Sequence, residues 1–392
     1  MGEWKEITLA DLCTDISYGY TESAKQEKVG PKFLRITDIA SGRLEWENVP
    51  YCPINESDFE KYKLLPGDIV IARTGATTGA NYTINESDPK DVVFASYLIR
   101  YKINSQIANP YYIGQLLQSP NWSDYVDAIA GGSAQPGANA KQLGSFEILL
   151  PPLPEQRAIA SILSSLDDKI DLLHRQNATL EKMAETLFRQ WFVEEAKEEW
   201  DEGTLDDILT VKGGSTPSTS EPAYWNGKIH WTSPKDITNL NGIYLFDTER
   251  KITELGLSKI SSGLLPKGTL LMSSRAPVGV LAFCEVPVAI NQGYIAILDN
   301  KGYSKEFIYL WLKANIDVVH SFSNGSTFME ISKTAFKTLQ LQLPPKQVMT
   351  DFQLLVKPLF NKIKSNHIQI RTLTALRDTL LPKLMSGEVR VD

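Results

Sequence analysis

Two stretches of the chain carry apolar residues at alternating spacings of four and three, the pattern of a coiled-coil seam. The first series is Ile159, Leu163, Leu166, Ile170, Leu173, Asn177, Leu180, Ala184, Leu187 and Trp191. The second is Phe352, Val356, Leu359, Ile363, Asn366, Ile370, Leu373, Arg377, Leu380 and Leu384. The pattern predicts two long helices, each spanning roughly 50 Å if about 35 residues are helical. The alternative, an amphipathic helix packed on its own globular half, would usually show a broader apolar stripe.

The polar positions in these series indicate how the helices pair. If they run antiparallel, Asn177 can face Asn366, and the same register brings Trp191 to Phe352 and Ile159 to Leu384. One buried polar pair in an apolar seam specifies register at some cost in stability. Arg377 interrupts the second seam, and Pro358 should kink that helix or mark a late start.

Outside the helices, short runs of Val, Ile, Tyr and Phe are broken by Gly, Pro and Asn, which predicts strands and loops. The segments also recur: LLPGDIVIARTGATTG (64–79) matches LLPKGTLLMSSRAPVG (264–279), and LLPPLPEQ (149–156) matches QLPPKQ (342–347). Each copy continues with a short helix (109–118 and 304–313), a glycine-rich loop, a strand (146–150 and 338–343) and a double proline. The chain is therefore an internal repeat.

The predicted fold class is α+β: two mixed α/β domains in a pseudo-twofold repeat, separated by two long helices that form an antiparallel coiled coil. The predicted boundaries are 1–150 for the first domain, 151–199 for the first helix, 200–343 for the second domain and 344–392 for the second helix.

The composition narrows the possible functions. The net charge is −7, and residues 1–150 carry −6 against −1 for residues 200–343, so any nucleic-acid contact must use a local basic surface. Three scattered cysteines and four dispersed histidines predict neither disulfides nor a metal site. No run approaches the roughly 20 apolar residues of a membrane span, and the start lacks a signal segment, so we expect a cytoplasmic protein without membrane contact.

Three segments resemble known catalytic or phosphate-binding motifs, but each lacks a residue or a strand that the motif requires. NPYY (109–112) has Tyr111 where an amino-methyltransferase motif needs proline, and a helix start with Pro110 in its first turn is the better interpretation. Asp68 and Asp88-Pro89-Lys90 imitate a nuclease set, but Pro89 would break the required strand. GATTG (75–79) lacks the lysine of a phosphate-binding loop. Since no catalytic set occurs in both copies, we expect a protein that is not an enzyme and holds no cofactor.

Loops with polar and basic residues that can contact base edges and phosphates do occur in both copies. Each copy has a Gly/Ser/Asn loop after its short helix, and an arginine beside small polar residues in a tight turn. The candidate DNA-binding residues are Arg35, Arg73, Thr74, Ser133, Gln135, Asn139 and Lys141 in the first copy, and Trp231, Ser233, Lys235, Ser274, Arg275, Ser326 and Thr327 in the second. Solvated loops are the plainer interpretation for any one of them.

The whole layout resembles the specificity subunit of type I restriction–modification systems. The resemblance rests on LPPLPEQRAIASIL (150–163), the helix ends LFRQWF and LLPKLMSGEV, and GGSTP (213–217) with YWNGKIHW (224–231) and Asp236; LRITDI (34–39) is a looser counterpart. PPKQ in the second copy departs from the PPLPEQ pattern.

The resemblance implies a non-catalytic subunit whose two target recognition domains each read half of an asymmetric, bipartite double-stranded DNA site. The helices would set the spacing and dock two modification subunits, which bind S-adenosylmethionine, and a restriction subunit would join them. It implies partner contacts at Glu155, Gln156, Arg189, Trp191 and Phe192.

Two alternatives stay open at this stage. The chain could serve a related system with a fused methyltransferase-nuclease partner, or it could be a two-headed adaptor that binds carbohydrate or protein. Binding that weakens steeply with salt would separate a DNA reader from the adaptor.

Overall fold

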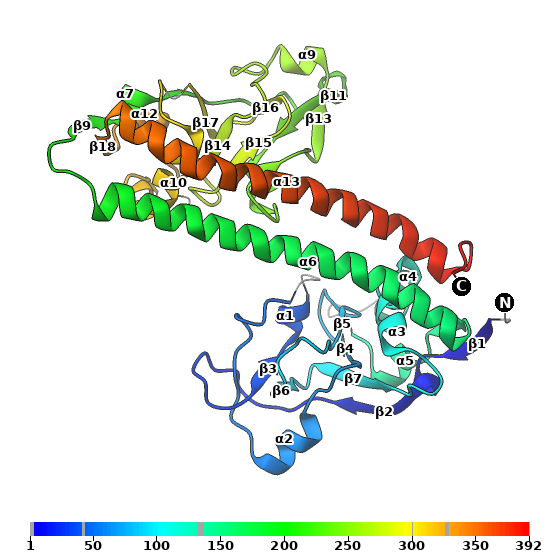
Figure 1. The fold of residues 1–392 in the computed structure, drawn as a ribbon. Coiled ribbons are helices and arrows are strands. Elements are labelled where there is room, and N and C mark those ends of the chain that lie inside the picture. The colour runs from blue at the N-terminus through cyan, green and yellow to red at the C-terminus, as the bar shows by residue number, and fades with distance from the viewer. Residues whose placement is uncertain (1–3, 41–43, 132–136, 300, 326–328, 392) are drawn as a thin grey trace. The chain divides into compact units, whose positions relative to one another are not determined.

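The computed structural model describes residues 4–40, 44–131, 137–299, 301–325 and 329–391, which form two compact units. Unit 1 comprises residues 1–170 and 372–392, and unit 2 comprises residues 171–371. Each unit contains one globular part together with a section of both long helices (Figure 1).

Unit 1 is built on a four-stranded sheet of order β2-β7-β4-β5, beside the two-stranded ladders β1-β8 and β3-β6. Its strands are β1 (Lys5–Thr8), β2 (Cys13–Tyr18), β3 (Lys32–Leu34), β4 (Asp68–Ala72), β5 (Asn81–Thr83), β6 (Val92–Phe94), β7 (Leu98–Ile103) and β8 (Glu147–Leu150). Its short helices are η1 (Ala10–Leu12), α1 (Ile36–Ile39), α2 (Glu56–Tyr62), α3 (Pro110–Leu116), α4 (Pro120–Ala130) and α5 (Ala140–Gly144).

Unit 2 is built on a five-stranded sheet of order β10-β17-β14-β15-β12, with the sheets β13-β11-β16 and β18-β9. Its strands are β9 (Asp201–Thr204), β10 (Thr210–Lys212), β11 (Trp225–Thr232), β12 (Tyr244–Leu245), β13 (Arg250–Ile252), β14 (Leu270–Ser273), β15 (Leu281–Cys284), β16 (Val288–Ile290), β17 (Tyr294–Asp299) and β18 (Gln340–Leu343). Its short helices are α7 (Leu205–Ile208), η3 (Pro222–Tyr224), α8 (Pro234–Thr238), α9 (Glu254–Leu257), α10 (Lys305–Ala314), α11 (Ile316–Ser321) and α12 (Lys333–Lys337).

The internal repeat is confirmed strand by strand. The antiparallel neighbours β2, β7, β4 and β5 of unit 1 have counterparts in β10, β17, β14 and β15 of unit 2. The parallel pair β3-β6 has its counterpart in β11-β16. The helix predicted to start at NPYY is α3, where the Asn109 side chain accepts hydrogen bonds from the Tyr111 and Tyr112 amides and Pro110 occupies the first turn.

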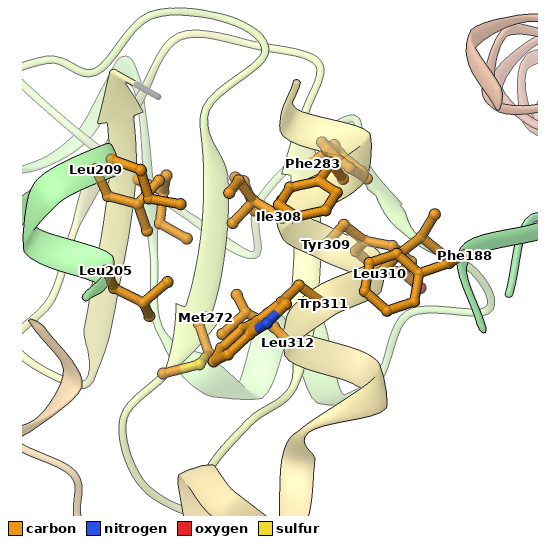
Figure 2. Close-up of a cluster of buried hydrophobic side chains, with 14 of the residues drawn as sticks. Phe188, Leu205, Leu209, Met272, Phe283, Ile308, Tyr309, Leu310, Trp311 and Leu312 are labelled. Atoms are coloured by element: carbon orange, nitrogen blue, oxygen red, sulfur yellow. The ribbon is translucent and has the colours of Figure 1, made fainter. Parts of the chain in front are cut away.

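The largest core lies in unit 2, where the apolar face of α10 meets the five-stranded sheet and α6. Figure 2 shows Ile308–Leu312 of α10 together with Met272 and Phe283 from the sheet and Phe188 of α6. Ser304 begins this helix by accepting a hydrogen bond from the Phe307 amide. Burying these large side chains, each contributing about 1.5–3 kcal/mol, ties the sheet to the long helix within the unit.

The two long helices are α6 (Leu153–Arg189) and α13 (Lys346–Met385). The predicted ranges were too long at their ends: after Arg189 the chain makes one π-helical turn, η2 (Gln190–Glu194), and α13 stops at Met385. The expectation that Pro358 kinks α13 or marks its start is wrong in the second respect, because the helix begins at Lys346. Pro358 is exposed, so water can solvate the carbonyl that loses its helical partner.

The antiparallel register is confirmed by contacts inside each unit. In unit 2, Asn366 Nδ2 donates to Asn177 Oδ1 over 2.9 Å, and the Trp191 and Phe352 ring centroids are 5.9 Å apart. In unit 1, Ile159 and Leu384 belong to the same buried cluster. Arg377, which interrupts the apolar seam of α13, lies in unit 1, and its Nη1 is 3.0 Å from Asp167 Oδ1 of α6.

Neither a membrane span nor a metal cluster is found in the part of the chain that the structure describes. No helix there is long and apolar enough to cross a bilayer, and no three His, Cys, Asp or Glu side chains gather as a metal site would require.

Candidate nucleic-acid interface

The turn after β4 is the centre of the candidate site in unit 1. The Arg73 amide donates to the Tyr97 carbonyl over 3.1 Å, and the Arg73 carbonyl accepts from the Ala138 amide over 2.9 Å. Thr74 pairs with Gly137 in an isolated antiparallel bridge. These bonds bring together three segments that are far apart in the sequence: the turn, the start of β7, and the loop that leads into α5.

Aromatic and basic side chains lie at this junction. The Arg73 guanidinium is 5.0 Å from the centre of the Tyr18 ring, and the Tyr18 hydroxyl accepts a hydrogen bond from the Ala140 amide. Tyr97 is 60% exposed, which is unusual for so large a ring, and Lys141 of α5 is also exposed. The Arg73 guanidinium is within cation–π range of the Tyr18 ring, and arginine is a residue type that binds base edges and phosphate.

Unit 2 repeats this backbone arrangement with other side chains. The Ser274 amide donates to the Gly293 carbonyl over 2.8 Å, the Ser274 carbonyl accepts from the Ile331 amide over 3.0 Å, and Arg275 pairs with Glu330. By these bonds Ser274 is the counterpart of Arg73, and Arg275 is the counterpart of Thr74. The two arginines therefore stand one position apart in this shared frame, and the turn in unit 2 is one residue shorter before the matching bonds of Gly79 and Gly279.

Arg35 and Ser233 occupy equivalent positions at the starts of α1 and α8, and each is engaged in capping its helix. Arg35 donates to Asp38 through both Nε and Nη2, over 3.0 and 2.7 Å, and this hydrogen bonding raises the pKa of the guanidinium. The Ser233 amide donates to Asp236 over 2.8 Å. Lys235 is exposed but forms an ion pair with Glu249 at 2.9 Å. Through its bonds to Asp38, the Arg35 side chain, which is 34% exposed, helps to hold the start of α1.

Two further candidates are buried, so the structure does not place their side chains at the surface. Trp231 is 5% exposed and donates from Nε1 to the Ser215 carbonyl, with the Trp225 ring edge-on against it. Ser274 is 3% exposed. Asn139 is exposed, but its side chain accepts from the Gln142 amide and caps α5. Ser133, Gln135, Ser326 and Thr327 lie outside the described residues.

Comparison with known proteins decides the family. The profile of the type I restriction modification DNA specificity domain matches residues 1–182 and again residues 197–371. The chain belongs to this family.

Similar proteins over most of the chain length are also specificity subunits of type I restriction enzymes. The specificity subunit of the type I restriction enzyme MjaIX of Methanocaldococcus jannaschii is 29% identical over 83% of this chain and 76% of its own length. That of HindI from Haemophilus influenzae is 23% identical over 99% of this chain and 100% of its own length. The crystal structure of a type I S subunit from M. genitalium shares the fold, with a TM-score of 0.63 at 18% identity, over 97% of this chain and 96% of that one. The chain is thus a specificity subunit, which supplies DNA recognition to a type I complex and is not catalytic.

The specificity-subunit motif PPLPEQ makes its contacts within unit 1. Gln156 is fully buried; its Oε1 accepts from the Asn109 amide and its Nε2 donates to the Pro151 carbonyl, both over 2.8 Å. Glu155 is 8% exposed and forms an ion pair with Arg390, and its Oε2 accepts from Trp4 Nε1. These two predicted partner contacts therefore join the start of α6 to the globular part and to both chain ends, and they do not present free side chains.

The remaining predicted partner contacts lie in unit 2. Trp191 and Phe192 are half-buried in the aromatic core, with the Phe192 ring 4.7 Å from that of Phe352. Arg189 is exposed and pairs with Glu194. Of the five residues, Arg189 is exposed, Trp191 and Phe192 are half-buried, and Glu155 and Gln156 are buried.

The residues missed by sequence reasoning are Tyr18 and Tyr97. Tyr18 precedes Gly19, where backbone leaves no room for a side chain: a Cβ there would clash with the Ala95 carbonyl oxygen. The sequence shows only the Tyr-Gly pair at 18–19, and the constraint on the glycine is visible in the structure alone. Tyr97 gave no signal, because its exposure depends on how β7 enters the sheet.

Proposed function

We propose that each unit of this specificity subunit reads one part of an asymmetric, bipartite duplex target. The supporting observation is the pair of turns after β4 and β14, which share a backbone hydrogen-bond frame and differ in their side chains. A common frame sets a common position against DNA, while different side chains select different bases. Two unlike readers suit an interrupted, non-palindromic target.

In unit 1 the proposed reading residues are Arg73 with Tyr18, together with the exposed Tyr97 and Lys141 and with Thr74 of the same turn. In unit 2 the proposed reading residue is Arg275, which is half-buried in the equivalent turn. An arginine that makes two hydrogen bonds to guanine discriminates against other bases by about 1–3 kcal/mol. Losing one should therefore relax the target at a single base pair.

The subunit works with partners that carry the chemistry. In this proposal two modification subunits, which bind S-adenosylmethionine, dock on the long helices, and a restriction subunit completes the complex in the cytoplasm. The candidate docking contacts in unit 2 are the apolar residues of its two long helices that are more than 40% exposed: Leu172, Met183, Leu354, Leu355 and Ile368.

The test is to change the two arginines separately and read the methylated motif by methylome sequencing of cells that carry the partner subunits. Arg73→Ala should relax one half of the motif, and Arg275→Ala the other half. Lys228→Ala, which removes an exposed cation of β11 that is not among the candidate DNA-binding residues, is the control and should leave the motif unchanged. An unaltered motif in both arginine variants would overturn the assignment of the turns as readers, and a change in both halves from one variant would overturn independent reading.

A further inference from the structure

The ammonium groups of Lys212 and Lys333 and the backbone of Lys259 lie at or next to the glycine-rich segment that follows β10 in unit 2. A Cβ placed on Gly213 would lie 3.0 Å from Lys333 Nζ, so that ammonium group sits directly over the glycine. Lys212 Nζ is 3.5 Å from the Ser262 carbonyl oxygen, and the Ser215 hydroxyl donates to the Lys259 carbonyl over 3.1 Å. All three lysines are exposed.

This lysine cluster, comprising Lys212, Lys259 and Lys333, adjoins the turn that holds Arg275. The Ile331 amide donates to the Ser274 carbonyl, which places the start of α12, and with it Lys333, beside the turn. Glu330 is the acidic residue on the same segment. Lysines next to a base-reading turn can hold the flanking phosphates, because phosphate contacts position a protein on the duplex.

The charge of the cluster is available to a ligand. Over the described residues of unit 2, Lys212, Lys259 and Lys333 form no ion pair with a carboxylate. Other lysines of the unit do, as with Lys235 and Glu249, Lys251 and Asp247, and Lys337 and Asp206.

Unit 1 has no such cluster at the matching positions. Strand register makes Ser17 the counterpart of Lys212 and Tyr18 that of Gly213. Ala140 corresponds to Lys333, because each follows the residue that caps the matching helix. In unit 2 the Lys333 ammonium group lies over Gly213. In unit 1 the residue that corresponds to Gly213 is Tyr18, whose ring lies 5.0 Å from the Arg73 guanidinium. The net charges agree: −6 for residues 1–150 and −1 for residues 200–343.

We infer that the two units divide the work of binding: unit 2 anchors the DNA backbone through Lys212, Lys259 and Lys333, and unit 1 contributes base contacts with little charge. The inference rests on the proposed function and adds the source of the electrostatic affinity. Each phosphate contact releases counterions, so it contributes about 0.9 to the slope of log affinity against log salt concentration.

The test uses the full chain assembled with its partner subunits and a duplex carrying its own methylated motif. Affinity is measured from 50 to 200 mM salt for the wild type, for Lys212→Gln/Lys333→Gln, and for the control Lys228→Gln/Lys357→Gln. The control removes the same charge from exposed lysines of unit 2 that lie outside the cluster. Thermal melting checks that both variants fold.

We expect the cluster variant to have a slope of log affinity against log salt concentration that is shallower by about 1.8. Raising the salt from 50 to 200 mM should therefore weaken DNA binding by the variant about 12-fold less than it weakens binding by the wild type. Target and unrelated duplexes should weaken alike, and the methylated motif should stay the same. A slope reduced no more than in the control, or a changed motif, overturns the inference and leaves the proposed function intact. Wild-type binding that is absent or independent of salt overturns both.

Discussion

Asn366 donates a hydrogen bond to Asn177 across the helix pair of unit 2, and each amide keeps one polar atom that has no partner among the described residues. The bond joins Nδ2 to Oδ1 over 2.9 Å, while Asn177 Nδ2 and Asn366 Oδ1 are buried and unsatisfied. Such a pair lowers the free energy of unfolding, because each buried donor or acceptor without a partner destabilises the folded state by about 1–3 kcal/mol. What it contributes is register, since any other alignment would separate the two amides.

Replacing both asparagines with leucine should therefore raise the free energy of unfolding by about 1–3 kcal/mol, measured by urea denaturation. Asn366→Leu alone should destabilise, because it leaves the Asn177 amide without its bond. Cysteines introduced at Leu173 and Ile370, which the same register pairs, should cross-link less completely in the double variant. A single variant as stable as the double one would contradict this account.

Arg377 and Asp167 should stabilise unit 1 as a pair and only weakly. Both side chains are about one-third exposed, and Asp167 also accepts a hydrogen bond from Gln115 Nε2 over 2.7 Å. A double-mutant cycle with Arg377→Leu and Asp167→Leu should give a coupling energy of about 0.5–1 kcal/mol. High salt should reduce it. A coupling near zero would mean that the interruption in the seam is merely tolerated.

His367 should make the stability of the chain depend on pH. Burial, and next the neighbouring His174, lower the pKa of its imidazole to about 4, and its Nε2 has no hydrogen-bond partner among the described residues. Between about pH 6.5 and 4 the unfolded chain binds the proton that the folded chain excludes. Stability is therefore complete above pH 6.5 and falls by roughly 3 kcal/mol as the pH drops to 4.

The matched variants for this prediction are His367→Gln and His320→Gln, with melting temperatures followed from pH 7 to 4.5. The first should remove most of the excess acid sensitivity, and the second should retain it. Equal acid sensitivity in His367→Gln and the wild type would refute the role of His367.

Gln156 should be essential to the stability of unit 1. Its side chain satisfies the Asn109 amide and the Pro151 carbonyl, and the residue at the equivalent position of the second copy is the buried Met349. Gln156→Met should destabilise by about 2–4 kcal/mol in denaturant unfolding, because both backbone groups lose their partners. Met349→Gln, its mirror image, should also destabilise, by burying an amide in an apolar site. A neutral Gln156→Met would show that the motif is kept for partner contact instead.

Arg35→Ala should lower stability without changing the methylated motif. The guanidinium of Arg35 is bound to Asp38, so its loss weakens the start of α1 by about 1 kcal/mol and removes no DNA contact. Thermal melting and methylome sequencing measure the two effects. A relaxed motif in this variant would return Arg35 to the reading surface.

The long helices and the internal repeat could be predicted from the sequence, because both are regular patterns of residues along the chain. The seams, their register and the order of the repeat all follow from spacing, because a heptad series or a recurring segment is visible without knowing any contact. The two arginine-bearing turns were also visible, but aligning their final glycines hid the one-residue deletion in the second turn.

The sequence by itself thus determined two mixed α/β domains, an antiparallel helix pair and a chain without a catalytic set. Only the tertiary structure decided which polar side chains are free. It turned Glu155, Gln156 and Trp231 inward, bound Arg35 to Asp38, and left Tyr97, Lys212 and Lys333 exposed. The physical reason is that periodicity reports which face of an element is buried, whereas the availability of a polar group depends on partners brought from distant parts of the chain.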